Sequence, residues 1–109
     1  MSLPLRVLLA GLLCGCTAAH GAGDPAAGAV KAKEICQACH GLDGNSQVPD
    51  YPKLGGQRQD YLAKALRDYK SGLRKNPIMA GMAAPLSAAD IDNVAAYYAS
   101  QRPVLIVKH

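Results

Sequence analysis

The stretch Ile35-Cys36-Gln37-Ala38-Cys39-His40 decides the fold and the chemistry of this chain. It contains Cys-x-x-Cys-His, the attachment signature of a c-type haem. Two thiols three positions apart on one helical turn can each add to one vinyl group of the same porphyrin. The next residue, His40, can then bind the iron as the proximal ligand. The sequence therefore predicts one haem c, held covalently by Cys36 and Cys39.

Two other chemistries use a Cys-x-x-Cys pair. A thioredoxin-like dithiol follows a strand within a βαβ pattern, and no such pattern is present. A four-cysteine zinc site needs a second pair nearby, and the only other cysteines, Cys14 and Cys16, lie in a segment that we expect to be removed. Neither alternative predicts a histidine directly after the second cysteine, so haem attachment is favoured.

Residues 1–21 have the features of an export signal. Arg6 supplies the positive charge, residues 7–13 are apolar, and small residues precede cleavage points after Ala19 or Gly21. The apolar run is too short for an ordinary membrane-spanning helix. We therefore expect a signal peptide at 1–21 and a mature domain at 22–109 that includes a short apolar tail, 103–109.

A lipoprotein signal is a second interpretation of the same segment. Leu13-Cys14-Gly15-Cys16 loosely matches a lipoprotein box with Cys16 as the lipidated residue, although Cys14 is unusual in such a box. The protein would contact the membrane only through that lipid. Both interpretations export the chain, which suits haem attachment outside the cytoplasm, and we expect a periplasmic protein.

The charge balance excludes one class of partner. The whole chain has a formal charge of +4, and removing Arg6 leaves 11 basic and 8 acidic side chains. No basic run is interleaved with base-stacking aromatics, so the sequence does not predict a nucleic-acid-binding protein. The small positive excess is compatible with a partner that carries a weakly acidic patch.

Helix signals divide the mature chain into three main helices, so the expected fold is all-α. The first helix spans 26–38 after the cap Asp24-Pro25, and Gly72 ends the second, at 59–71. Ser87 and Asp90 form a capping box for the third, which Pro103 ends. The apolar face of the second helix contains five residues: Tyr61, Leu62, Ala65, Leu66 and Tyr69.

Long loops separate these helices. Residues 41–56 are rich in Gly, Asn, Asp, Ser and Pro, and residues 73–86 contain Asn76-Pro77, which we expect to break any helix there. Three helices are little regular structure for a domain of this size. A haem in the middle of the domain would complete its core. Four residues could supply the second axial ligand: Met79, Met82, His20 and His109. A methionine in the loop is favoured over histidines near the cleavage point and the chain end, and spacing leaves the choice of methionine open.

The chain resembles a class I c-type cytochrome, and it is most similar to one half of the dihaem cytochrome c-four family and to its monohaem relatives. The resemblance covers nearly all of the mature chain. The matching stretches are Gly23-Asp24, Ala27-Gly28, Cys36-Gln37-Ala38-Cys39-His40-Gly41, Asp43-Gly44-Asn45-Ser46, Tyr51-Pro52-Lys53-Leu54-Gly55-Gly56-Gln57, Tyr61-Leu62, Lys70-Ser71-Gly72, Asn76-Pro77-Ile78-Met79, Leu86-Ser87 and Ala95-Ala96-Tyr97-Tyr98.

This resemblance implies a small class I fold around one haem and assigns several roles. Met79 matches the ligand methionine, and Met82 is a packing residue and the fallback ligand. Pro52 matches the proline whose carbonyl accepts the Nδ1–H of the proximal histidine, His40. Leu54 matches a leucine that packs on the haem. The resemblance also implies that the first and last helices cross at a glycine, here Gly28.

The function that the resemblance implies is transfer of single electrons between redox proteins. The expected partners are a quinol-oxidising complex, a terminal oxidase, or a periplasmic dehydrogenase or reductase. The dihaem family continues into a second haem domain where this sequence stops at His109, so we expect a single-haem relative. No acid–base or nucleophile constellation is visible, and we do not expect an enzyme.

Two alternatives stay open. The chain could be a haem subunit docked permanently on a dehydrogenase or oxidase complex, with the apolar segment 104–107 as its contact. It could also be an open-site haem enzyme or gas sensor. The second alternative is disfavoured because five-coordinate cytochromes of the four-helix type carry Cys-x-x-Cys-His near the chain's end, whereas here it comes early.

Overall fold

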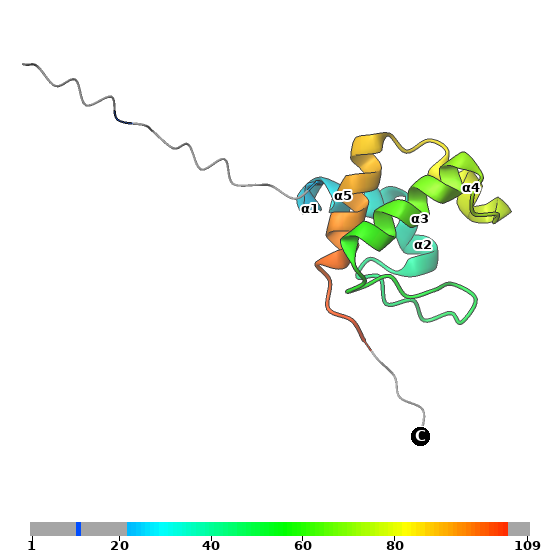
Figure 1. The fold of residues 1–109 in the computed structure, drawn as a ribbon. Coiled ribbons are helices and arrows are strands. Elements are labelled where there is room, and N and C mark those ends of the chain that lie inside the picture. Colours follow the sequence, from blue (N-terminus) through cyan, green and yellow to red (C-terminus); the bar gives the residue numbers. More distant parts are fainter. Residues whose placement is uncertain (1–10, 12–21, 105–109) are drawn as a thin grey trace, which may run out of the picture.

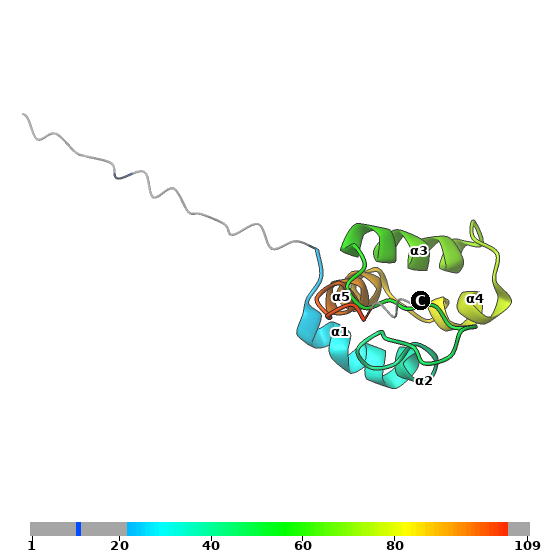
Figure 2. The ribbon, with the colours of Figure 1, turned by 90° about the horizontal axis from the view of Figure 1, so that it is seen from below.

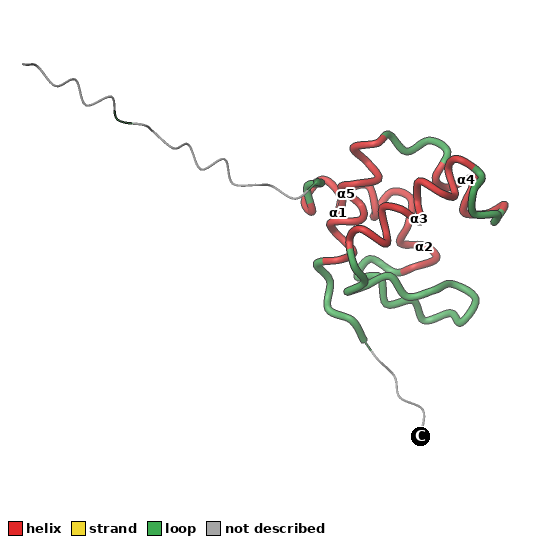
Figure 3. Tube along the Cα trace, in the orientation of Figure 1, coloured by secondary structure: helices red, strands yellow, loops and turns green. Residues whose placement is uncertain are grey.

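The computed structural model describes Gly11 and residues 22–104, and in this part of the chain the regular structure is entirely helical (Figures 1 and 3). This confirms the predicted fold class. Along the chain the elements are α1 (Pro25–Lys31), the π-helical segment η1 (Ala32–Cys36), α2 (Gln37–His40), α3 (Gln59–Ser71), α4 (Pro77–Ala83) and α5 (Ala88–Ala99).

The first three elements form one continuous helical run. Asp24 caps it by accepting a hydrogen bond from the Ala26 N–H, and Pro25 occupies the first position, as predicted. The run ends at His40, two residues beyond the predicted end, because Gly41 adopts a positive φ of 80°. Its middle turn is a π-helix, which sequence reasoning did not predict. The motif cysteines lie at the end of that turn and on α2.

The helix α1 crosses α5 at Gly28, which confirms the predicted crossing point. A β-carbon on Gly28 would lie 1.9 Å from the Asn93 carbonyl oxygen, so the two backbones approach as closely as glycine allows. Figure 2 shows α1 beneath α5, with α3 across the other side of α5. Among the described residues, the core cluster has eight buried members: Ala32, Leu62, Ala63, Leu86, Ile91, Val94, Ala95 and Tyr98.

The helix α3 has the predicted bounds, and Gly72 ends it with a left-handed φ of 85°. Its outer face carries ion pairs, of which Arg67–Asp92 links α3 to α5 at 3.4 Å. The five residues of its predicted apolar face all line one cavity, which confirms that they share a face. Tyr61 is 50% exposed at the edge of that face.

The prediction of a loop over 73–86 is wrong, because α4 forms within it. The Asn76 side chain accepts hydrogen bonds from the Ile78 and Met79 N–H groups, and Pro77 occupies the first turn. Proline is tolerated at that position, where its missing N–H has no helical acceptor. The pair Asn76-Pro77 therefore begins a helix where we expected it to break one.

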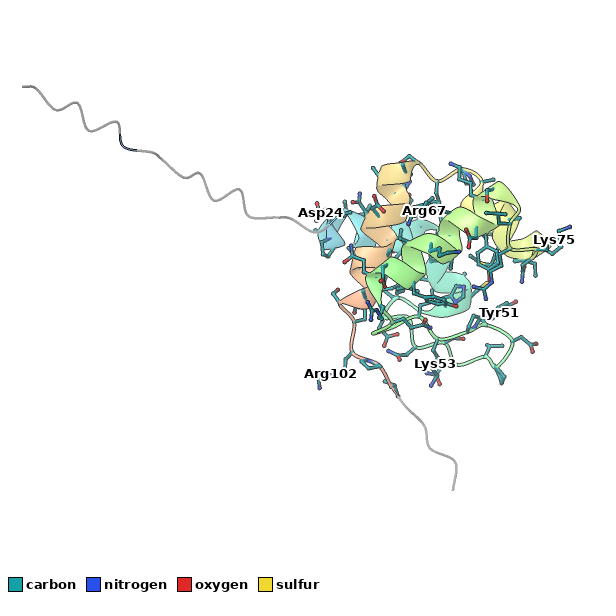
Figure 4. All side chains as sticks on the ribbon, viewed as in Figure 1. Asp24, Tyr51, Lys53, Arg67, Lys75 and Arg102 are labelled. Atoms are coloured by element: carbon teal, nitrogen blue, oxygen red, sulfur yellow. The ribbon has the colours of Figure 1, made fainter. Side chains whose placement is uncertain are left out.

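The helix α5 begins at the predicted capping box of Ser87 and Asp90. It ends at Ala99, four residues before Pro103, so the predicted end is too late. The residues after α5 lie against the loop 41–56, and the Pro103 ring packs against Gly56 of that loop. Lys53 on this loop donates to the Val104 carbonyl, and Figure 4 labels Lys53 and Arg102 on this side of the molecule.

Several predictions fall outside the described residues. They concern the signal peptide 1–21 with Cys14, Cys16 and His20, of which only Gly11 is described, and the tail beyond Val104 with His109. Within the described part, no helix is long and apolar enough to cross a membrane.

Candidate functional site

A cavity with two lobes, of about 190 and 120 Å³, lies between α2, α3, α4 and the loop 50–54. The lobes share part of their walls, and both are lined mainly by apolar atoms. The shared lining residues are Cys36, His40, Pro52, Leu66, Tyr69 and Met79. The larger lobe adds Cys39 and Met82, and the smaller adds Leu54. The structure therefore brings every predicted site residue among those it describes to this one cavity.

His40, the last residue of α2, is only 7% exposed. Its Nδ1 lies 2.8 Å from the Pro52 carbonyl oxygen, twelve residues along the chain. A carbonyl can only accept, so Nδ1 carries the proton and the opposite ring atom, Nε2, is left with a free lone pair. This bond fixes both the tautomer and the ring orientation, and it increases the basicity of Nε2 as a metal ligand.

Cys36 and Cys39 are free thiols, both partly buried. Burial raises the pKa of Cys36 to about 11, against a smaller lowering effect of its hydrogen bond to Tyr98. The thiol is therefore protonated at neutral pH. Addition of a cysteine to a vinyl group uses both the sulfur and the hydrogen of the S–H group, so this state is the complete reactant.

The two methionines lie on α4, three positions apart. Met79 is partly buried and lines both lobes, whereas Met82 is 45% exposed and lines only the larger one. The Met79 N–H is also fixed at 3.1 Å from the side chain of the capping residue Asn76. The thioether of Met79 is therefore the more enclosed and the better positioned of the two.

Sequence reasoning missed Arg74, at the rim of the smaller lobe. Its guanidinium lies 4.8 Å from the centre of the Tyr69 ring, and Nη1 lies 3.4 Å from the Tyr61 hydroxyl. That hydrogen bond raises the pKa of Arg74 above its already high ordinary value. Arg74 provides a permanent cation at the cavity, and nothing in Leu73-Arg74-Lys75 distinguishes it from a solvated arginine.

The donor set suits iron inside a macrocycle. Among residues 22–104, no group of three or more His, Cys, Asp or Glu side chains is placed to hold a metal ion. An imidazole and a thioether would fill the two axial positions of an iron whose other ligands belong to a bound ring. The apolar cavity, two thiols on its wall and a cation at its rim fit a haem with vinyl and carboxylate substituents.

Comparisons with known proteins agree with this site. The family model for cytochrome c matches residues 25–101. Cytochrome c4 of Pseudomonas aeruginosa is 48% identical over 94% of this chain and 47% of its own length. Cytochrome c-554(548) of Halomonas halodenitrificans is 47% identical over 73% of this chain and 99% of its own length. The crystal structure of reduced recombinant cytochrome c4 from Pseudomonas stutzeri superimposes with a TM-score of 0.70 at 47% identity, covering 74% of this chain and 47% of that one.

These matches define a class I cytochrome c fold that binds one covalently attached haem c. The chain belongs to the cytochrome c family. It spans about half the length of the curated cytochrome c4 proteins that it matches, in agreement with the predicted resemblance to one half of that dihaem family.

Proposed function

We propose that this protein is a periplasmic one-electron carrier, in which His40 and Met79 bind the haem iron and Cys36 and Cys39 form the thioether bonds. The observation that carries the proposal is the convergence of these four side chains on one apolar cavity. The predicted export signal supports the periplasmic location.

When bound, the haem supplies an iron that exchanges one electron between the ferrous and ferric states. The residues of the chain set the conditions for that exchange. Pro52 holds the His40 ring at a fixed angle, and the Met79 thioether favours the ferrous state. Leu54 and Leu66 exclude water, which disfavours the additional positive charge of ferric iron. We therefore expect a relatively positive reduction potential.

Partner contact is expected at the larger lobe of the cavity. Ile78 is 60% exposed there, and Met82 lies on the same short helix. Small apolar surfaces of this kind suit brief encounters, as electron transfer requires. A relative from Thiomonas intermedia that is named thiosulfate dehydrogenase electron acceptor is 45% identical over 69 residues. We propose that this protein likewise exchanges electrons with other redox proteins. The candidate partners are a quinol-oxidising complex, a terminal oxidase, or a periplasmic dehydrogenase or reductase.

The ligand assignment is tested by absorption spectroscopy of the oxidised protein. Ferric haem with a sulfur axial ligand shows a weak long-wavelength charge-transfer band. We expect this band to disappear in Met79→Ala and to persist in the matched control Met82→Ala. Loss of the band only in Met82→Ala would reverse the assignment. Persistence in both variants, or absence from the wild type, would exclude methionine ligation.

The carrier function is tested by purification. A carrier is recovered as a free protein that is oxidised and reduced reversibly without binding carbon monoxide in its ferrous form, because both axial positions are filled. Recovery only within a stable complex would instead support a permanently docked haem subunit. Binding of carbon monoxide by the native protein would support an open-site enzyme or sensor.

A further inference from the structure

Tyr98 on α5 is the largest fully buried side chain among the described residues, at 1% exposure. Its hydroxyl lies 3.1 Å from the Gly41 carbonyl oxygen, to which it donates a hydrogen bond, and it is also the hydrogen-bond partner of the Cys36 thiol. Gly41 directly follows His40, and its carbonyl also accepts a hydrogen bond from the Gly44 N–H at 3.2 Å. Burial strongly raises the pKa of Tyr98, so the hydroxyl keeps its proton and remains a donor.

The ring of Tyr98 is also seated tightly against the loop that follows the haem motif. A β-carbon on Gly44 would lie 2.8 Å from the Tyr98 ring carbon Cδ1. The Tyr98 carbonyl accepts a hydrogen bond from the Gly56 N–H at 2.9 Å. The position of the hydroxyl is therefore fixed by the packing of its own side chain and backbone.

His40 is consequently held from two directions. Pro52 holds the imidazole at Nδ1, and Tyr98 holds the backbone one residue further along. Rotation of the imidazole about its side-chain bonds strains the first contact, and displacement of the backbone at His40 strains the second. Removing either contact weakens the restraint on the ring. Without the Tyr98 hydroxyl, the partly buried Gly41 carbonyl keeps only the Gly44 N–H, at 3.2 Å, as a donor from the protein.

We propose that the Tyr98 hydroxyl is a positioning group for the proximal ligand, acting on His40 through the Gly41 carbonyl. The inference rests on the proposed role of His40 as that ligand. We expect that loss of the Tyr98 hydroxyl lengthens the hydrogen bond between His40 Nδ1 and the Pro52 carbonyl. The imidazole then donates less electron density to the iron, and the ferrous state gains relative to the ferric.

The neighbouring Tyr97 offers a matched control. Its hydroxyl donates to the Leu42 carbonyl at 2.5 Å, one residue further from His40, and its ring lies 5.2 Å from that of Tyr98. Tyr97 is only partly buried, so water can replace its hydroxyl. The variants Tyr98→Phe and Tyr97→Phe each remove one oxygen and keep the ring.

The experiment compares these variants as haem-loaded proteins. In the ferrous state we expect the His40 Nδ1–H to exchange with solvent about tenfold faster in Tyr98→Phe, and within about twofold of the wild type in Tyr97→Phe. At a fixed ambient potential, the ferric-to-ferrous ratio should fall about threefold in Tyr98→Phe alone. An unchanged exchange rate or an unchanged ratio in Tyr98→Phe would overturn the proposal.

Two further measurements distinguish a positioning role from a loss of overall stability or of the ligand itself. Equal acceleration of the Leu62 and Ala63 amides on α3 would indicate general destabilisation and would contradict a positioning role. If Tyr98→Phe fails to retain haem, the test is made on the Tyr98 hydroxyl proton of the wild-type protein. The proposal requires that this proton exchange slowly with solvent and show a nuclear Overhauser contact to Gly41, and absence of either would overturn it. Absence of a paramagnetic shift on His40 in the ferric protein would instead refute the ligand assignment, whatever the state of Tyr98.

Discussion

A β-carbon placed on Gly28 would lie 1.9 Å from the carbonyl oxygen of Asn93 and 2.8 Å from the β-carbon of Tyr97. The α1 and α5 backbones therefore meet at a point that only glycine can occupy. This contact anchors one end of the helical run that delivers Cys36 and His40 to the cavity. Its disruption should propagate directly to the haem motif.

We predict that Gly28→Ala lowers the free energy of unfolding of the haem-loaded protein by about 1–3 kcal/mol, the usual effect of overpacking a close contact. The measurement is denaturant unfolding followed by helical circular dichroism. Gly81→Ala in α4 is the control, because a β-carbon added there would meet no atom within 4 Å. It should stabilise the protein by about 0.5–1 kcal/mol. Equal effects of the two substitutions would contradict the close crossing.

A second prediction concerns the cap of α4. The Asn76 side chain accepts from the Ile78 and Met79 N–H groups, each at 3.1 Å. Asn76→Ala should destabilise this short helix by about 1 kcal/mol and loosen the Met79 ligand. We expect the charge-transfer band of the oxidised protein to disappear at a lower denaturant concentration than in the wild type. Asn76→Ser, which keeps a capping oxygen, should restore most of the difference; failure to do so would exclude capping as the cause.

The helix caps and helix ends that the sequence predicted are specified by local chemistry, whereas the crossing at Gly28 and the His40–Pro52 contact were predicted from the family resemblance. Asp24 and Ser87 each cap a helix with their own side chain, and Gly72 ends α3 because it adopts a left-handed φ. Each feature depends on residues within one turn of it. The motif itself is equally local, since its two thiols and its imidazole lie on adjacent turns.

Other features depend on contacts that no local pattern records. The pair Asn76-Pro77 can end one helix or begin another, and the seven residues of α4 are too few for periodicity to decide. The π-turn of η1 contains ordinary helix-forming residues. Nothing in that pattern separates a π-turn from an α-helical turn. The hydrogen bond from Tyr98 to Gly41 joins residues 57 positions apart.

A third prediction concerns Asn45, which is 7% exposed and holds the chain after α5. Its Nδ2 donates to the Arg102 carbonyl at 3.0 Å, and its Oδ1 accepts from the Val104 N–H at 2.9 Å. Asn45→Ala should cost about 1–3 kcal/mol, because it leaves these partners unpaired. It should also accelerate hydrogen exchange at the Val104 N–H, which loses its acceptor. Asn45→Asp keeps that acceptor and should have a smaller effect, and unchanged exchange in Asn45→Ala would exclude this anchoring role.

A fourth prediction is a pH dependence that originates at Asp43. The Asn45 N–H donates to Asp43 Oδ1 at 2.9 Å, and this hydrogen bond holds the pKa of the carboxyl below its ordinary value of 3.8. Because the folded pKa is the lower one, the unfolded chain binds more protons in this range, and stability rises with pH there. The contribution of Asp43 is therefore fully present above the unfolded pKa and is lost as the pH falls through the folded pKa.

The test compares the wild type with Asp43→Asn, which cannot ionise but keeps an acceptor oxygen. The stability advantage of the wild type should be largest above about pH 5 and should shrink steadily below about pH 4. Hydrogen bonds to the carboxylate cause this shift, so added salt should leave the advantage at neutral pH nearly unchanged. An advantage that stays constant across the acid range, or one that salt abolishes, would show that the Asn45 N–H is not what stabilises the ionised carboxyl.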